Sequence, residues 1–421
     1  MTTASSGPAP AGGSVRTLMR SGTSIAIAIG VMNVATYGFT MVAARVLGPR
    51  DYGALASLMA TLLVFGVLQL GLQATAARRI SSQPDDVGQI ELSIMSVTYR
   101  AAVVLGAVLL LATPLLNQLL RLDDLRAAAL VGVAAIPMSI MGGQAGILQG
   151  ERRWWPLAAM YVAAGVPRLV VGTALIFWQP EVFYAMLGVT LGMFAPIALG
   201  WLALRHKRVA GSSPGHDARS VLRESFHNSQ ALLAFFALSN VDVVIARNVL
   251  PDHQSGLYAA GLIMTKAVLF LPQFVVVVAF PSLSSPRERR RAMVRGLGIV
   301  GVIGVLATLA AWLLSGLAMI FVGGSEYTEI QSQLWLFAAL GTLLAMLQLL
   351  VYAVLARQGQ RSVYAVWLAL VLMVAAGLTT STLTGLLTVV LSVDTVLVAL
   401  LLAASFSLLR HPAPVEETVS P

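Results

Sequence analysis

The sequence predicts an all-α integral membrane protein with about twelve transmembrane helices, and composition and hydropathy lead to this fold class. Hydrophobic residues make up 57% of the 421 residues and charged residues only 11%, compared with about 45–50% and about 25% in soluble domains. Apolar stretches recur from residue 24 to residue 409, and each, at about 20 residues, is long enough to cross a hydrocarbon core about 30 Å thick. Gly and Pro within these stretches argue against transmembrane strands.

Hydropathy divides the chain into twelve candidate spans. They are residues 24–46, 54–74, 95–118, 127–148, 157–178, 183–204, 229–249, 257–281, 297–321, 332–356, 363–380 and 386–409. The polar run from Thr379 to Thr384 is the only break between the last two. Residues 1–23 open with a segment rich in Ser, Gly, Pro and Ala, so we expect a disordered cytoplasmic N-terminus.

The basic residues predict the orientation of these spans. Nineteen of the 27 Lys and Arg residues fall in one set of alternate loops and tails, and only Arg45, Arg50, Arg121, Arg126 and Arg247 fall in the other. Because basic loops stay in the cytoplasm, both termini are predicted to be cytoplasmic. Topology therefore explains the net charge of +9, and no nucleic-acid partner is implied.

Several classes of chemistry are disfavoured by composition. Cys is absent, which excludes disulfides and thiol catalysis. The five His residues lie in loops or near span ends without ligand-like spacing to carboxylates, so neither a metal site nor a cofactor is expected. The predicted outer loops are very short, which disfavours a membrane glycosyltransferase or glycan polymerase, since such an enzyme needs an exposed catalytic base. We expect a protein that is not an enzyme.

The longest internal loop divides the spans six and six. We expect an N-terminal lobe at residues 24–204, a cytoplasmic linker at 205–228, a C-terminal lobe at 229–409 and a cytoplasmic tail at 410–421. Transporters are often built from two homologous bundles around a central site. This division therefore predicts two pseudo-repeated six-helix bundles around a central cavity.

An internal repeat supports the two bundles. Residues 44–55 (ARVLGPRDYGAL) align with residues 246–258 (ARNVLPDHQSGLY), so that Arg45 matches Arg247. The interval from Arg to Pro is four residues in both copies, and that from Arg to Gly is eight in one and nine in the other. These matched positions favour a structural role for both arginines at the outer rim of each lobe over contact with cargo.

Small residues at helical spacing predict close contacts between helices. They are Gly142 with Gly146, Gly188 with Gly192, and the series Gly298, Gly301 and Gly304.

Four segments carry a resemblance to a known family. Residues 44–56 and 71–80 resemble the opening of polysaccharide-export flippases, the Wzx-like branch of the multidrug/oligosaccharidyl-lipid/polysaccharide superfamily. Residues 240–247 and 256–272 are similar to the seventh and eighth helices of that branch. The resemblance implies a V-shaped pair of six-helix lobes in the bacterial cytoplasmic membrane, opening alternately to each side. Many relatives have fourteen spans, and this chain departs from them with twelve.

The same resemblance implies the cargo and the partners. The cargo is a polyprenyl-pyrophosphate-linked or similar glycan, threaded head-group first through a polar cavity between the lobes. Membrane lipids surround the protein, and a glycan polymerase or a glycosyltransferase is an implied partner in cell-envelope polysaccharide biosynthesis.

Charged residues inside the predicted spans are the candidate site. A central Arg or Lys costs about 2.5–3.5 kcal/mol on insertion scales, so such residues usually face a bundle interior or a wet cavity. Arg168, which follows Pro167, is the clearest candidate, and Lys266 and Arg100 come next. Guanidinium and ammonium groups suit a diphosphate, particularly where water is scarce.

Residues nearer the span ends complete the set. Arg45 and Arg247 are included as candidate substrate-binding residues with the structural alternative given above. Asp242 is a candidate for uptake of a proton or sodium ion, and Asp394 is a weaker one. An ion-coupled drug or metabolite antiporter on the same scaffold remains the alternative to a flippase, and it would favour a lumen rich in carboxylates and aromatic rings.

Overall fold

The computed structural model describes residues 12–205, 218–270, 289–355 and 360–410, and within these ranges the regular structure is helical without a strand. The first half of the chain contains α1 (Gly12–Phe65), α2 (Val67–Ser82), η1 (Pro84–Asp86), α3 (Val87–Leu111), α4 (Thr113–Leu119), α5 (Leu125–Gly150), α6 (Trp154–Trp178), α7 (Val182–Gly192) and α8 (Phe194–Leu204). The second half contains α9 (Ala218–Val249), α10 (Asp252–Phe270), α12 (Arg289–Leu313), α13 (Ser315–Val322), η2 (Ser325–Gln333), α14 (Leu334–Leu355), α15 (Gln360–Gly377) and α16 (Leu383–Arg410).

These helices account for the predicted spans. Among the described residues, nine helical segments are long and apolar enough to cross a membrane, and the first, Ser24–Ser82, is long enough for two crossings. Val363–Gly377 is a shorter apolar helix, and α10 supplies the described part of the span predicted at 257–281. The remainder of that span, residues 271–281, lies outside the described residues. Each predicted span thus has a helical counterpart, and the predicted fold class is confirmed.

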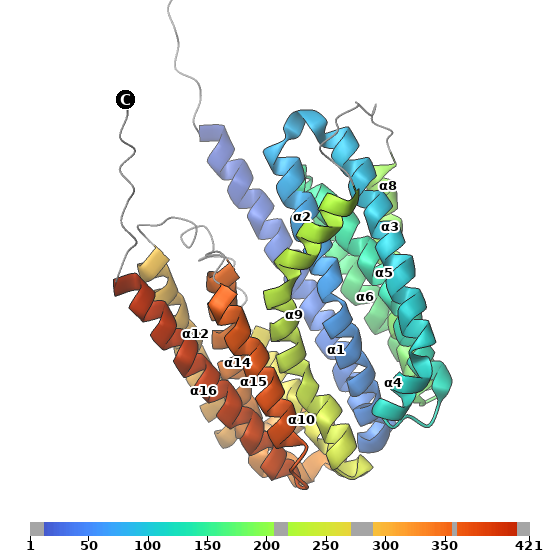
Figure 1. Ribbon diagram of the computed structural model, residues 1–421. Helices are drawn as coiled ribbons and strands as arrows, with labels where there is room; N and C mark the ends of the chain where they lie inside the picture. Colours follow the sequence, from blue (N-terminus) through green and yellow to red (C-terminus); the bar gives the residue numbers. More distant parts are fainter. Residues whose placement is uncertain (1–11, 206–217, 271–288, 356–359, 411–421) are drawn as a thin grey trace, which may run out of the picture.

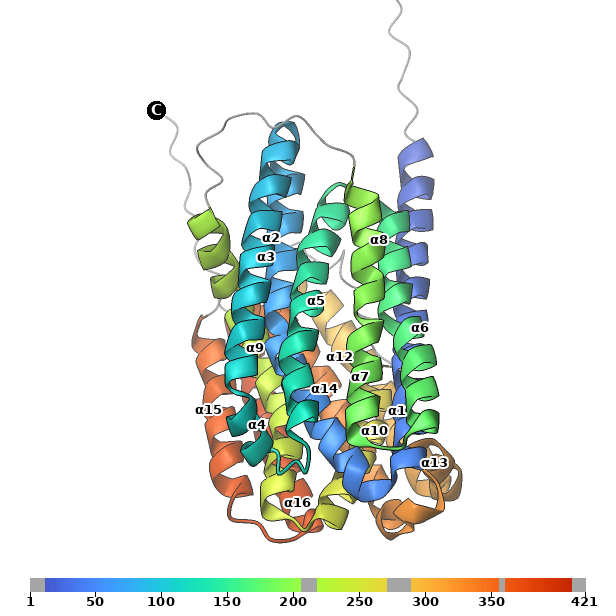
Figure 2. The same ribbon diagram turned by 90° about the vertical axis from the view of Figure 1, so that its right-hand side faces the viewer.

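The two crossings of the segment Ser24–Ser82 are separated by a sharp kink in α1. Gly48 has φ +73° and ψ 174°, a conformation that favours glycine, and Pro49 follows it without an N–H to donate. Pro49 cannot donate the helical hydrogen bond to the carbonyl of Arg45, so the helical pattern is interrupted at this point. The chain turns back here, as the blue ribbon in Figure 2 shows.

The helices form two halves that follow the order of the chain (Figure 1). Helices α1 to α8 make the first half, and α9 to α16 make the second, with α1 and α10 packed against each other between them. We call the two ends of the bundle proximal and distal. The proximal end holds the start of α1 and the end of α16, and the distal end holds the α1 kink, the α4–α5 turn and the α9–α10 turn (Figures 1 and 2).

Two helices begin earlier than predicted. Helix α1 begins at Gly12 rather than at residue 24, and α9 begins at Ala218 rather than at 229. The beginning of α9 belongs to the predicted linker, yet Val221 is buried in a cluster with Leu72 and Ile94 of the first half. A hydropathy window detects only the apolar, membrane-spanning part of a helix. It therefore does not predict where a polar extension of that helix begins.

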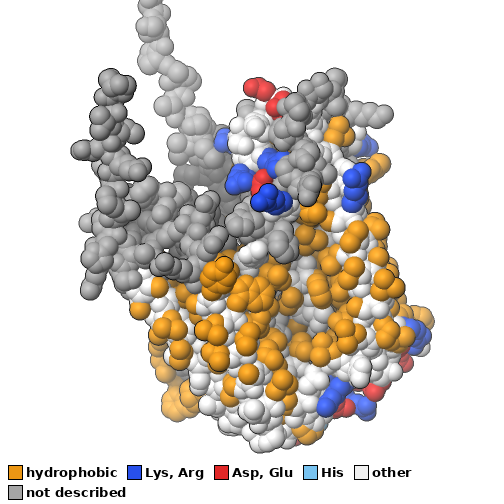
Figure 3. Space-filling model, viewed as in Figure 1, with side chains coloured by type: hydrophobic (Ala, Val, Ile, Leu, Met, Phe, Trp, Pro, Cys, Tyr) orange, Lys and Arg blue, Asp and Glu red, His pale blue; other side chains and the backbone are white. Residues whose placement is uncertain are grey.

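The surface of the bundle has the polarity of a membrane protein. In the face shown in Figure 3, hydrophobic side chains cover the middle, and charged side chains gather towards the two ends. Large apolar side chains such as Leu111, Trp178 and Trp312 are exposed. The chain is therefore a multi-pass membrane protein.

Glycine contacts pack several helices closely. A Cβ atom at Gly142 would lie 2.4 Å from the carbonyl oxygen of Gln69, and one at Gly188 would lie 2.3 Å from Cα of Gly172. Gly146, Gly192 and Gly304 are similarly crowded, so the predicted packing role of these five glycines is confirmed. The same prediction is wrong for Gly298 and Gly301, where a Cβ atom would meet nothing within 4 Å.

Candidate functional site

A cavity of about 120 Å³ lies between the two halves of the chain. Its walls come from α1 on both sides of the kink, from α6, and from α9 and α10. The polar and charged residues that line it are Thr36, Tyr37, Thr40, Tyr52, Arg168, Asn240, Asp242 and Lys266. The cavity therefore combines cationic, anionic and hydroxyl side chains from both halves at one place.

Arg168 reaches this cavity from α6. It lies ten residues before the distal end of α6 at Trp178, which is about 15 Å at 1.5 Å per residue. The Nε atom of Arg168 is buried, and it has no hydrogen-bond partner within the described parts of the chain. Gly192 of α7 sets the local helix spacing, because a Cβ atom there would lie 2.8 Å from Cα and N of Arg168.

Lys266 enters the cavity from α10 on the opposite half. It lies fourteen residues after Asp252, where α10 begins, which is about 21 Å from the distal end. Neither Lys266 nor Arg168 forms a salt bridge with a described carboxylate. Lys266 and Asp242 are nevertheless close enough for their charges to attract. The sequence prediction that Arg168 and Lys266 lie in a bundle interior agrees with this placement.

Asp242 belongs to a buried acidic cluster in the second half. Its Oδ2 atom accepts a hydrogen bond of 2.9 Å from the hydroxyl of Tyr258, and its Oδ1 accepts one from the amide of Val243. Asp394 of α16 is 1% exposed and close enough to interact electrostatically with Asp242 and Tyr258. Its Oδ1 atom has no hydrogen-bond partner among the described residues. Two carboxyl groups and a hydroxyl are thus brought together away from solvent.

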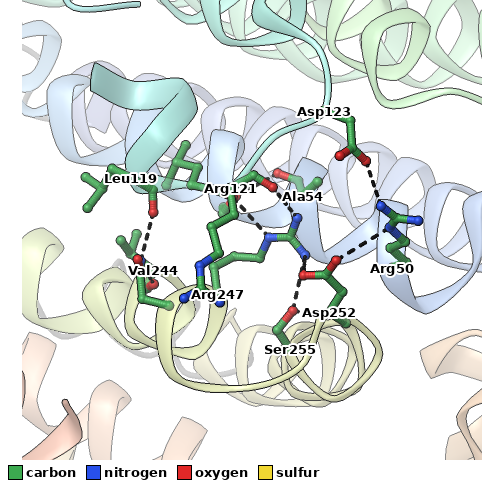
Figure 4. Close-up of polar contacts among 12 residues, drawn as sticks. Arg50, Ala54, Leu119, Arg121, Asp123, Val244, Arg247, Asp252 and Ser255 are labelled. Atoms are coloured by element: carbon green, nitrogen blue, oxygen red, sulfur yellow. Dashed lines mark hydrogen bonds and ion pairs between the residues drawn. The ribbon is translucent and has the colours of Figure 1, made fainter. Parts of the chain in front are cut away.

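Arg45 and Arg247 lie at the distal end rather than in the cavity. Arg45 is exposed beside Gly324. Arg247 is only 3% exposed and contacts residues of α10 and of the α4–α5 turn (Figure 4). A second cavity of about 200 Å³ adjoins Arg247, with Asp51 and Glu181 in its wall.

Arg100 does not join the other cations. It is exposed on the face of α3 that also carries exposed Tyr99, Val103 and Val104, and it is not part of the lining of the central cavity. Hydropathy gave its depth in the span but could not give the face of the helix. Arg100 therefore does not contribute to the candidate site, and its prediction as a substrate-binding residue is not supported by this placement.

Sequence reasoning missed the contribution of Tyr258. A signal was present, because Asp242 and Tyr258 are each eight residues from Leu250, between two consecutive helices. Residues at equal distances from the turn of a helical hairpin lie at similar depth. The approach of Asp394 had no such signal, since α16 lies far along the chain. Within the described residues, no group of three or more His, Cys, Asp or Glu could hold a metal ion.

Solved structures with the same architecture are multidrug and related transporters. An inward-facing multidrug resistance MATE family transporter of the MOP superfamily has a TM-score of 0.72 and 14% identity, covering 90% of this chain and 94% of that one. The MATE multidrug transporter DinF-BH, solved in complex with a ligand, has a TM-score of 0.69 and 12% identity, with coverage of 93% and 95%. At these identities the likeness concerns the fold alone.

A third similar structure is a MOP superfamily transporter from Pyrococcus furiosus, described as having reverse polarity of its binding pocket. Its TM-score is 0.62, its identity is 15%, and the match covers 94% of this chain and 96% of that one. No curated protein matches the sequence.

The family is given by the sequence itself. Residues 18–287 match the family described as polysaccharide biosynthesis protein. This match covers more than half of the chain and includes both copies of the internal repeat. The fold is that of solved transporters. The chain therefore belongs to the polysaccharide biosynthesis protein family, and it has the fold of the MATE transporters.

Proposed function

We propose that this protein translocates a polyprenyl-(pyro)phosphate-linked oligosaccharide, or a related glycolipid, across the bacterial cytoplasmic membrane by alternating access. In this role it serves cell-envelope polysaccharide biosynthesis, with a glycan polymerase or a glycosyltransferase as partner. The proposal rests on one observation above all. Arg168 and Lys266 line one cavity between the two halves, and neither forms a salt bridge with a described carboxylate.

The chemistry of these two cations suits a phosphate-bearing head group. Arg168 offers a planar fork of donors, and its buried Nε atom is unpaired among the described residues. Lys266 supplies a compact charge from the opposite half. Charge-assisted hydrogen bonds to phosphate are stronger than neutral ones, and they strengthen further where water is excluded. An anion held by both residues would bridge the two halves of the protein.

The size of the cavity places a condition on the mechanism. A volume of about 120 Å³ is several times the share of one water molecule in the liquid, about 30 Å³, and it is too small for a whole oligosaccharide. The diphosphate would therefore dock first, and the sugars would enter only as the halves move apart. The lipid chain would remain in the bilayer.

The buried acidic cluster is the proposed coupling site. Asp242 lines the cavity and also contacts Tyr258, so it connects Lys266 with Asp394. Uptake of a proton or sodium ion by this cluster would weaken the attraction of Asp242 for Lys266. Lys266 would then be available to the anionic cargo, which links ion binding to cargo binding.

The orientation is part of the proposal. The distal end carries Arg45, Arg50, Arg121, Arg126 and Arg247, whereas the loops of the proximal end carry most of the basic residues. Because basic loops stay inside, we assign the distal end to the outer face and both termini to the cytoplasm.

Complementation of a deletion strain tests the function. Loss of the gene should cause one lipid-linked glycan to accumulate on the cytoplasmic side, and the wild-type gene should restore export. Arg168→Ala and Lys266→Ala should each fail to restore it at normal expression. Arg100→Ala is the matched control, because it also removes a cation from a span but not from the cavity, and it should restore export. Normal export with Arg168→Ala would contradict the proposed site.

A drug antiporter is the second candidate, and one observation favours it. The cavity contains Asp242 and two tyrosines in addition to its cations, and similar structures are multidrug transporters. That function predicts proton-coupled efflux of a cationic dye, abolished by Asp242→Asn and little affected by Arg168→Ala. The flippase proposal predicts no such efflux.

A further inference from the structure

The two copies of the internal repeat meet at the distal end. Gly53 of α1 and Gly256 of α10 hold matching positions in the repeat, and their backbones are in contact. A Cβ atom at Gly53 would lie 2.9 Å from Cα of Gly256, and one at Gly256 would lie 1.8 Å from the carbonyl oxygen of Pro49. The backbones of the two halves are therefore in direct contact at the distal end, where the two copies of the repeat meet.

Arg247 joins the two halves beside this contact. From α9, its Nε donates to the carbonyl of Leu120 at 3.1 Å, and its Nη2 donates to the carbonyl of Arg121 at 2.7 Å (Figure 4). The neighbouring Asn248 donates to the carbonyl of Leu119 at 2.8 Å. One helix of the second half thus holds three successive carbonyls at the end of α4 and in the α4–α5 turn of the first half.

A second layer of charges fixes the guanidinium of Arg247. Its Nη1 atom lies 3.4 Å from Oδ1 of Asp252 and 3.3 Å from Oγ of Ser255. Asp252 also lies 3.6 Å from Arg50 of α1, which forms a 3.0 Å salt bridge with Asp123 (Figure 4). We call Arg50, Asp123, Arg247, Asn248 and Asp252 the distal clasp.

The matching arginine of the other repeat makes a weaker contact. Arg45 of α1 reaches the connection between α13 and α14, which corresponds in the second half to the α4–α5 turn. A Cβ atom at Gly324 would lie 3.3 Å from Nη2 of Arg45, so the guanidinium rests over this glycine. Arg45 is exposed whereas Arg247 is buried. The two arginines therefore occupy matching positions in the repeat, but Arg247 makes more contacts than Arg45.

From this geometry we propose that Arg247 is the positioning residue that holds the distal end closed, and that opening of this end requires the α4–α5 turn to leave α9. Every hydrogen bond from Arg247 to the first half ends on a backbone carbonyl of a turn, which water can solvate after release. Apolar side chains in the same place would be left in unfavourable contact with water after release. The clasp therefore suits a contact that forms and breaks in each transport cycle, and Arg45 serves as its weaker counterpart.

The absence of Cys from the whole sequence makes a direct test simple. Met59 lines the central cavity from α1, so Met59→Cys reports whether a membrane-impermeant maleimide can enter from the outer face of intact cells. The single Met59→Cys variant should label slowly. Adding Arg247→Ala should raise the labelling rate at least tenfold, and Arg247→Lys should raise it less. Adding Arg45→Ala should have a smaller effect than Arg247→Ala.

Arg100→Ala, combined with Met59→Cys, is the matched control and should leave the rate unchanged. An unchanged rate with Arg247→Ala would overturn the proposal. Should Arg247→Ala fail to reach the membrane, Asn248→Ala tests the same clasp, and a rate equal to that of Met59→Cys alone would likewise overturn it. The labelling measurement needs no cargo. A negative labelling result would therefore contradict the clasp but not the flippase proposal, and a negative export result would contradict the flippase proposal but not the clasp.

A distance measurement separates opening from local damage. Trp178→Cys at the distal end of α6 and Thr379→Cys after α15 place spin labels on exposed positions of the two halves. In the purified protein, Arg247→Ala should lengthen the distance between these labels. A shorter or unchanged distance together with faster labelling would point to local loosening, and it would overturn the assignment of Arg247 as a clasp.

Discussion

Tyr327 contacts α1 close to its kink. This side chain of η2 is fully buried, and its hydroxyl donates a 2.7 Å hydrogen bond to the carbonyl of Ala44. That carbonyl lies four residues before Gly48, whose non-helical conformation interrupts the helix. A residue far along the chain thus holds α1 beside the kink.

Removal of this hydroxyl should destabilise the protein. Tyr327→Phe removes this buried hydrogen bond, and a typical hydrogen bond contributes about 0.5–1.5 kcal/mol to stability. The midpoint of thermal unfolding in detergent should therefore fall. Tyr364→Phe is the control, because Tyr364 is 67% exposed, and it should change the midpoint little. Equal effects of both substitutions would contradict the role of Tyr327.

Two glycine substitutions should act in opposite directions. Gly256→Ala places a methyl group against the backbone of Pro49, which no side-chain movement can relieve, so the unfolding midpoint should fall. Gly298→Ala meets nothing within 4 Å on α12, and the better helix propensity of Ala, up to about 1 kcal/mol, should raise it. Thermal unfolding of both variants measures the difference. A stabilising Gly256→Ala would contradict the close contact of α1 with α10.

For single residues, the sequence predicted the depth of a side chain in the membrane better than the face of the helix on which it lies. Arg168 and Lys266 were identified because charged residues inside a span need a wet or polar surrounding. The same argument selected Arg100, which faces outward. Hydropathy carries no information about the face of a helix on which one charged residue lies. Likewise, spacing alone selected Gly298 and Gly301 although they pack against nothing.

Helix α5 begins with a cap that also shapes the distal turn. The side chain of Asp124 accepts a 2.8 Å hydrogen bond from the amide of Arg126 and is paired with the guanidinium of the same residue. Burial raises the pKa of Asp124, but the hydrogen bonds and the charge of Arg126 outweigh it and hold this pKa below its ordinary value.

Loss of this cap should weaken α5 in a pH-dependent way. Asp124→Ala should cost about 1 kcal/mol of unfolding free energy at neutral pH. Because the pKa of Asp124 is lowered by folding, its contribution is complete above the unfolded pKa of about 3.9 and is lost as the pH falls through the folded pKa. Unfolding of both proteins at neutral and strongly acidic pH should show the difference shrinking. A difference that grows in acid would contradict this cap.

The contact of α6 with α7 positions the cavity cation. Gly192→Ala would place a methyl group 2.8 Å from the backbone of Arg168, so α6 must shift and carry the guanidinium with it. We expect glycan export to fall several-fold at normal expression. Gly301→Ala, on open surface of α12, should export normally. Equal export by the two variants would contradict the role of the α6–α7 contact in positioning Arg168.

Helix number was predictable, whereas helix limits were not. Each apolar run gave one span because length and hydropathy suffice to cross a bilayer. The starts of α1 at Gly12 and α9 at Ala218 lie outside those runs. The turn between α15 and α16, marked only by the polar run at residues 379–384, does separate two helices.

For the whole molecule, the internal repeat was the most informative feature of the sequence. It predicted two bundles, and its matched glycines, Gly53 and Gly256, meet between them. The repeat could not predict the inequality of its arginines. Arg247 is buried because the α4–α5 turn offers it carbonyls, while Arg45 rests over a glycine. Such differences arise from the packing of segments that the alignment does not include.

Transport by the purified protein tests most directly whether the cavity shared by the two halves carries a phosphate-linked glycan. Proteoliposomes would contain the protein and a fluorescent polyprenyl-diphosphate disaccharide, and a membrane-impermeant reagent would report its movement between leaflets. We predict transfer by the wild-type protein and by Arg100→Ala, and almost none by Arg168→Ala or Lys266→Ala. Wild-type transfer no faster than in protein-free vesicles, or equal transfer by Arg168→Ala, would contradict the account.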